Sequence, residues 1–60
     1  MIVTLAEKIE RYLRDNAMAE TLFGRRAVND PRLVSDMRRG RQIGARVRTR
    51  IETFMREHHA

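Results

Sequence analysis

The sequence predicts an all-α fold, a small domain of four helices (three to five) with a helix-turn-helix at its centre. Residues that favour helices (Ala, Leu, Met, Glu and Arg) are abundant in the 60-residue chain, which contains one Pro and three Gly. Apolar residues recur at three- and four-residue spacing, and no run alternates apolar and polar positions as a half-buried strand would. We therefore expect residues 1–60 to form a single domain, with the helix-turn-helix motif at about residues 20–39.

The small size of the chain limits its core. A domain of 60 residues buries only about 60% of the surface that its unfolded chain exposes. The absence of cysteine excludes a disulfide framework and any cysteine-ligated zinc. Small domains without such cross-links often depend on a partner subunit, so we expect a homodimer.

The first helix is predicted from Leu5 to about Asp15. Thr4 and Glu7 are spaced as a capping box, in which the hydroxyl and the carboxylate each accept a hydrogen bond from a free backbone N–H. The other side of this helix is charged, and its carboxylates, Glu7 and Glu10, are expected to be solvated. An apolar stripe completes the helix, made of Leu5, Ile9, Tyr12 and Leu13.

The second helix is predicted from about Ala19 to Val28, with Leu22, Phe23 and Ala27 on its inner face. Gly24 lies inside this helix, where a glycine costs about 1 kcal/mol relative to alanine. A glycine at such a position usually has a structural reason, so we expect another helix to approach it closely.

The third helix, predicted from about Pro31 to Arg39, has the clearest boundaries. Asp30 is a strong N-cap, and Pro31 suits the first helical position, where its missing N–H has no consequence. Gly40 suits the left-handed residue just past the end of the helix. The inner face consists of Leu33, Val34 and Met37.

A short loop, residues 41–43, leads to the fourth helix, predicted from about Gly44 to His58. Apolar surface left over from Phe54 and Met55 is the expected dimer contact, with the N-terminal helix as the competing surface. The full apolar stripe of the fourth helix consists of Val47, Ile51, Phe54 and Met55.

Positive charge is concentrated in the middle of the chain. The net charge is +5, but residues 24–50 hold nine arginines against Asp30 and Asp36, a net charge of +7. Twelve of the thirteen basic residues are Arg, whose planar guanidinium suits bidentate contact with phosphate and guanine. The basic block coincides with the motif, which favours a nucleic-acid partner over a merely solvated surface. A membrane-surface helix is disfavoured because the apolar faces are needed for the core.

Small and apolar positions within residues 20–39 fall in the order of a known motif. Phe23 precedes the small Gly24, and Ala27 follows one turn later; after the corner, Val34 and Met37 lie three apart. This order resembles the helix-turn-helix of the Cro/lambda-repressor-like superfamily, also called the XRE family. The run MRRGRQ is similar to the stretch after that family's recognition helix, where a glycine ends the helix and a basic residue follows.

The corner of the motif departs from the family pattern. Val28 stands where the family usually has Gly, and Asn29 stands at a position that is usually apolar. The family commonly has five helices, and 60 residues leave room for about four. Because Asn tolerates a left-handed backbone, we expect this turn to be built differently.

The resemblance implies a recognition helix, about Pro31–Arg39, that lies in the major groove of DNA. Arg32 and Arg39 suit guanine O6 and N7. Asp36 can accept a hydrogen bond from cytosine N4 or pair with one of these arginines and orient it, and the second role is favoured because phosphates repel a carboxylate. The full set expected to contact base edges is Arg32, Ser35, Asp36 and Arg39. Phosphate contacts are expected from Thr21, Arg38, Arg41, Gln42 and Arg46. Four further arginines either contact nucleic acid or are simply solvated, namely Arg25, Arg26, Arg48 and Arg50.

These expectations describe a sequence-specific double-stranded DNA-binding protein. It would be a small transcriptional regulator of bacterial or phage type, a homodimer in the cytoplasm associated with the nucleoid. No catalytic site, cofactor or metal is expected, because polar groups do not converge and because His58 and His59, adjacent on a helix, point about 100° apart. The alternative is a helical protein-interaction module that binds an acidic protein partner. RNA binding is disfavoured, since Tyr12, Phe23 and Phe54 are expected to be buried.

Overall fold

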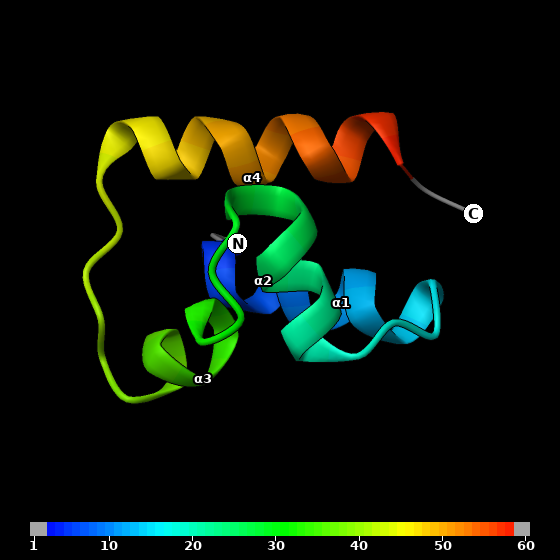
Figure 1. The fold of residues 1–60 in the computed structure, drawn as a ribbon, viewed down its shortest axis with the longest axis horizontal. Helices are drawn as coiled ribbons and strands as arrows, with labels where there is room; N and C mark the ends of the chain where they lie inside the picture. Colours follow the sequence, from blue (N-terminus) through cyan, green and yellow to red (C-terminus); the bar gives the residue numbers. More distant parts are fainter. Residues whose placement is uncertain (1–2, 59–60) are drawn as a thin grey trace.

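The computed structural model describes residues 3–58, and within them the chain forms helices α1 (Leu5–Asp15), α2 (Glu20–Val28), α3 (Leu33–Arg38) and α4 (Ala45–Glu57) (Figure 1). The described part of the chain contains no strand. The predicted all-α class is therefore confirmed. The predicted ends of the first, second and fourth helices agree with the observed ends to within one residue, whereas α3 is shorter than predicted.

Local signals at both ends define α1. The Thr4 hydroxyl accepts a hydrogen bond from the backbone N–H of Glu7 at 3.1 Å, which is one half of the predicted capping box. The other half, a hydrogen bond accepted by the Glu7 carboxylate, is not formed within the described residues. At the other end Ala17 has a left-handed backbone (φ 50°), and the N–H of Met18 donates to the carbonyl of Leu13 at 3.0 Å. This bond, between residues five positions apart, is typical of a Schellman cap, which here ends the helix without a glycine.

Gly24 lies where α2 passes the turn that leads into α3. A Cβ at this position would lie 2.1 Å from the carbonyl oxygen of Asp30 and 3.2 Å from the Cβ of Leu33. The Gly24 carbonyl also accepts a hydrogen bond from the N–H of Asp30 at 2.9 Å. The expected close approach is confirmed, with the backbone of the turn as the nearest neighbour. Asn29, at φ 58°, supplies the left-handed residue on which the corner turns.

The predicted start of the third helix is wrong by two residues. Pro31 and Arg32 form a turn, and the α-helix begins at Leu33. Asp30 caps this turn, since its side chain accepts the N–H of Arg32 at 3.0 Å and its carbonyl accepts the N–H of Leu33 at 3.2 Å. An Asp followed by Pro suits the first two positions of a type I turn as well as a helix start, so the same two residues support both structures.

The predicted end of α3 is confirmed in its mechanism. Gly40 has φ 102°, the conformation in which glycine is favoured. The N–H of Gly40 donates to the carbonyl of Met37 at 3.0 Å, and the N–H of Arg41 donates to the carbonyl of Asp36 at 2.9 Å. These two bonds form a Schellman cap, which turns the chain out of the helix toward α4.

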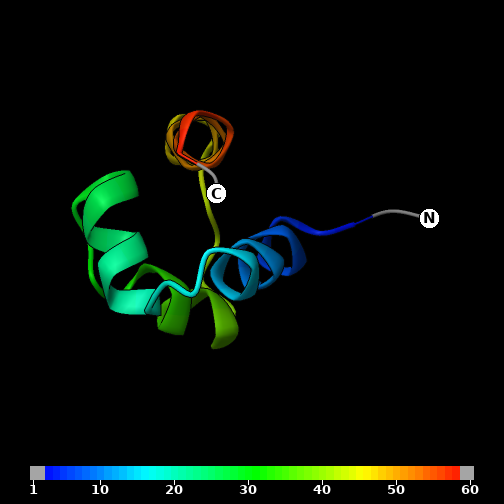
Figure 2. The same cartoon turned by 90° about the vertical axis from the view of Figure 1, so that its right-hand side faces the viewer.

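The helices pack around one core, with α2 against both α3 and α4, and α1 against α3. Figure 2 shows α4 end-on, with α1 and α3 below it and α2 rising beside it. Leu22, predicted to face inward, is instead 37% exposed, because the side of α2 that faces the core is set by Phe23, Gly24 and Ala27. The buried core consists of Leu5, Ile9, Tyr12, Phe23, Ala27, Leu33, Val34 and Ile51.

Three aromatic rings join α1, α2 and α4. The ring centroids of Tyr12, Phe23 and Phe54 lie 5.5 to 6.1 Å from one another in tilted or edge-to-face arrangements. The Tyr12 hydroxyl donates to the carbonyl of His58, which ties the end of α4 to α1. Tyr12 and Phe23 are buried as predicted, and Phe54 is half-buried.

None of the helices in residues 3–58 has the length and apolar character needed to cross a membrane.

Candidate nucleic-acid interface

Residues predicted to contact bases lie along α3 and at its two ends. Arg32, in the turn before the helix, and Arg39, one residue past its end, are exposed. Ser35 and Asp36, within the helix, are half-buried. A helix of six residues is about 9 Å long, so Arg32 and Arg39 lie at the two ends of a short helix.

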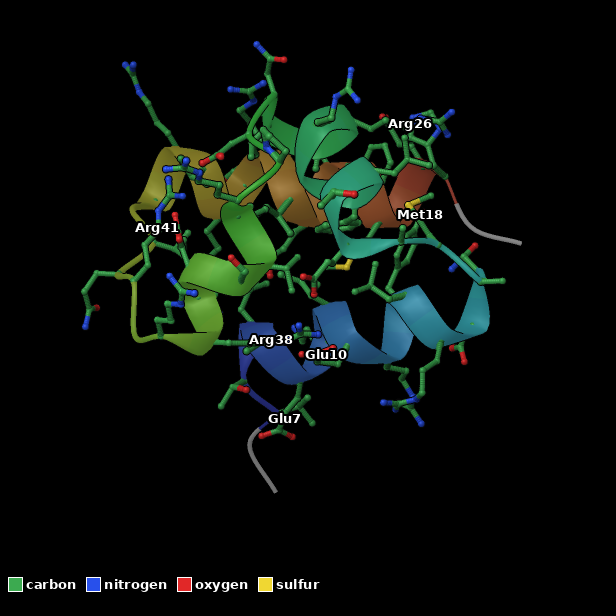
Figure 3. All side chains as sticks on the ribbon, turned by 60° about the horizontal axis from the view of Figure 1, so that its bottom comes forward. Glu7, Glu10, Met18, Arg26, Arg38 and Arg41 are labelled. Carbon is green, nitrogen blue, oxygen red and sulfur yellow. The ribbon has the colours of Figure 1, made fainter. Side chains whose placement is uncertain are left out.

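Arg38 connects three helices through ion pairs. Its Nε and Nη2 atoms donate to the two carboxylate oxygens of Glu10 on α1 at 2.8 and 2.9 Å, and its Nη1 donates to Glu20 on α2. Figure 3 shows Arg38 reaching across to Glu10, while Glu7 points away from this pair. The hydrogen bonds from Arg38 hold the pKa of Glu10 below its usual value. Glu10 is thus not simply solvated as predicted, and the predicted phosphate ligand Arg38 already holds two carboxylates.

Arg41 closes a second ion-pair cluster at the other side of α3. Its Nη1 lies 2.7 Å from Oδ2 of Asp30 and 3.5 Å from Oδ2 of Asp36. The bond from Arg41, together with the N–H of Arg32, lowers the pKa of Asp30. Asp36 was expected to orient Arg32 or Arg39, and this prediction is wrong, because its ion-pair partner is Arg41. The cluster ties the loop after α3 back to the turn before it.

The two flanks of α4 differ in how their arginines are neutralised. Arg48 lies 3.9 Å from Glu52, whose carboxylate also lies 3.9 Å from Lys8 on α1. Arg46 and Arg50, one turn apart on the other flank, have no carboxylate within 4 Å among residues 3–58 and line one shallow hollow. Six arginines within residues 24–50 form no ion pair with the described residues, namely Arg25, Arg26, Arg32, Arg39, Arg46 and Arg50.

The remaining predicted phosphate ligands lie at different places. Thr21 is exposed and follows Glu20, the partner of Arg38, so it lies near the end of α3. Gln42 is exposed in the loop of residues 39–44, which runs along one side of the molecule from α3 to the start of α4 (Figure 1). The structure therefore brings Arg39, Gln42 and Arg46 to this side.

The ion pairs of Arg38 and Arg41 were beyond the reach of sequence patterns. Glu10 and Arg38 are separated by 28 residues, and Asp30 and Arg41 by 11. No helical spacing relates residues so far apart, so only the packing of the helices reveals them. His59 lies outside the described residues, and within residues 3–58 no group of three or more His, Asp or Glu side chains is placed to hold a metal ion.

Acid should weaken the fold by protonating the carboxylates that pair with Arg38 and Arg41. The folded-state pKa values of Glu10 and Asp30 are lowered, so their stabilising effect is complete above the unfolded values of about 4 and is lost as the pH falls below them. We expect the urea midpoint to fall between pH 6 and pH 3. The fall should be smaller in Arg38→Met and Arg41→Met, which lack the cations, than in Arg25→Met. Equal falls in all three variants would show that the clusters do not stabilise the fold.

A scan against protein-family models finds no match, and searches of curated proteins and of solved structures find no match either. The resemblance to the Cro/lambda-repressor-like family therefore stays a prediction.

Proposed function

We propose that this chain binds double-stranded DNA through α2, the turn of residues 29–32 and α3, as a small transcriptional regulator of bacterial or phage type. One coincidence in the structure supports the proposal. The turn before α3 packs against α2 at Gly24, and Arg32 and Arg39 stand unpaired at the two ends of α3. Guanidinium groups at both ends of a rigidly held helix can reach base edges when the helix lies in the major groove.

The dimensions of α3 suit the major groove. The major groove of B-form DNA is about 12 Å wide, and an α-helix with its side chains is about 10–12 Å across, so α3 can lie in the groove. Arg32 and Arg39 then face base edges, where guanidinium groups favour guanine O6 and N7. Ser35 lies between them and can donate or accept a hydrogen bond.

Charge neutralisation at α3 removes an obstacle to this contact. A free carboxylate near phosphates is repelled, and Asp36 lies on the proposed recognition helix. Arg41 is 3.5 Å from Asp36 and 2.7 Å from Asp30, so its single positive charge offsets part of the negative charge of these two carboxylates.

A second copy of the chain is part of the proposal, because one short recognition helix covers little DNA. Two recognition helices in successive major grooves lie about 34 Å apart, and one copy measures 30 × 27 × 19 Å. Phe54 and Met55 pack partly against the core and leave less apolar surface for a dimer than predicted. The large apolar side chains exposed in residues 3–58 are Val3 and Leu22.

Replacing the two arginines at the ends of α3 should test the proposed base contacts. Arg32→Ala and Arg39→Ala should each weaken binding to the preferred duplex by about 5- to 150-fold, the equivalent of 1–3 kcal/mol, and weaken binding to random duplex much less. Arg11→Ala is the matched control, since it removes the same charge from the exposed side of α1. Binding is measured by fluorescence anisotropy with duplexes selected from a random pool.

Two outcomes would contradict the proposal. Failure of the unaltered chain to bind any duplex at about 50 mM salt, where the electrostatic contribution is strong, would exclude it. Binding to polyglutamate but not to duplex DNA would instead support the alternative, a helical module for an acidic protein partner.

A further inference from the structure

The arginines of α4 are divided between two flanks with different surroundings. Arg46 and Arg50 are four residues apart and so lie on one face of the helix. Arg50 lines a hollow together with Ala27 of α2, which places this flank on the α2 side. Arg48 lies on the opposite flank, where Glu52 and Lys8 of α1 surround it. One flank of α4 therefore carries two arginines that form no ion pair with the described residues, while Glu57 lines the same hollow as Arg50.

This flank begins where the chain leaves α3. The loop of residues 39–44 runs from the end of α3 to the start of α4 along one side of the molecule (Figure 1). A chain that leaves a helix lying in the major groove must pass one rim of the groove, and the rim is a row of phosphates. The start of α4 is the first regular element beyond that rim.

The other arginines near α3 are less free to bind phosphate. Arg38 would have to leave both Glu10 and Glu20, and the two carboxylates would then face the phosphates unpaired. If Arg41 turned to bind a phosphate, it would likewise leave Asp30 and Asp36 unpaired. Arg46 and Arg50 lose no ion pair when they bind phosphate, so the gain from phosphate contact is not offset.

We infer that the α2-facing flank of α4 is a phosphate-binding surface, on which Arg46 and Arg50 hold the backbone of the DNA duplex beside the groove that α3 enters. This inference rests on the proposed function and adds a contact outside the helix-turn-helix. Phosphates carry no sequence information, so the flank strengthens binding to every duplex equally and fixes the position of α3.

The test is the salt dependence of duplex binding by the full chain. Each phosphate contact contributes about 0.9 to the slope of log K against log salt concentration. The double variant Arg46→Gln with Arg50→Gln should lower the slope by about 1.8 per bound subunit and keep the ratio between preferred and random duplex unchanged. The matched control, Arg48→Gln with Arg56→Gln, removes the same charge from α4 and should keep the original slope. Replacing Arg46 and Arg50 by Lys, which keeps the charge, should also keep it.

The outcomes separate this inference from the proposed function. Equal slopes in the two glutamine double variants would overturn the inference and leave DNA binding through α3 intact. Absence of duplex binding by the unaltered chain would overturn both. Circular dichroism of each variant confirms that the measured molecules are folded. If the double variant is not, Arg46→Gln and Arg50→Gln are measured singly, each with an expected fall in slope of about 0.9.

Discussion

Gly24→Ala should leave little folded protein at 25 °C. The new Cβ would lie 2.1 Å from the carbonyl oxygen of Asp30, a backbone atom that cannot swing aside as a side chain can. Relief requires that α2 and the turn before α3 move apart, which also breaks the hydrogen bond from Asp30 to the Gly24 carbonyl. We expect destabilisation of at least about 3 kcal/mol, and a domain this small rarely has more than about 3–5 kcal/mol of stability.

The other two glycines provide graded controls for this variant. Gly40→Ala meets no atom within 4 Å, but the backbone at φ 102° is unfavourable for alanine, so a loss of about 1–2 kcal/mol is expected. Gly44→Ala has neither obstacle and should lose less than about 1 kcal/mol, the usual effect at an N-cap. The measurements are urea titrations followed by far-UV circular dichroism. Equal urea midpoints for Gly24→Ala and Gly44→Ala would show that the close packing of α2 against the turn is not present in solution.

Phe23→Ala should have the second largest effect on stability. Phe23 is fully buried, and its ring contacts Tyr12 of α1 and Phe54 of α4 at centroid distances of 5.5 and 5.6 Å. Truncation of a buried Phe usually destabilises a protein by about 3–5 kcal/mol, through lost burial and the remaining cavity. Three helices meet at this ring, so the variant should lose the cooperative unfolding transition.

Leu22→Ala is the matched control, because Leu22 precedes Phe23 on the same helix and is 37% exposed. It should lower the free energy of unfolding by less than about 1 kcal/mol. Both residues were predicted to face the core, so the pair also tests the orientation of α2. Similar losses of stability in the two variants would show that Leu22 is buried in solution, as it would be in a dimer that uses this surface. The destabilisation by Leu22→Ala would then depend on protein concentration.

Most boundaries of the helices could be predicted because they depend on neighbours in the chain. The capping bond from the Glu7 N–H to the Thr4 hydroxyl and the glycine cap after α3 each join residues within five positions of one another. The apolar stripe of α1 is likewise a local pattern, and its main residues are buried. The start of α3 was predicted too early because Asp30-Pro31 favours a type I turn as well as a helix, and local preferences cannot separate the two.

The positions of the candidate site residues along α3 were also predictable, but their ion pairs were not. Arg32 and Arg39 are exposed at the ends of α3, as the pattern around Leu33 and Val34 indicated. From the sequence alone Arg38 and Arg46 are equivalent, since both are arginines in one basic block. The folded chain distinguishes them, because α1 and α2 bring carboxylates to Arg38 and no described carboxylate comes to Arg46.

The sequence by itself determined the all-α class, the ends of α1, α2 and α4, the need for glycine at position 24, and the concentration of arginine around the motif. These properties follow from hydrogen bonds and apolar spacings within one or two helical turns, which any short segment contains. Only the tertiary structure decided which arginines are neutralised, which flank of α4 is unpaired, and that Leu22 is exposed. The physical reason is that an ion pair or a burial fraction depends on the distance between segments, and that distance is set only when the helices pack.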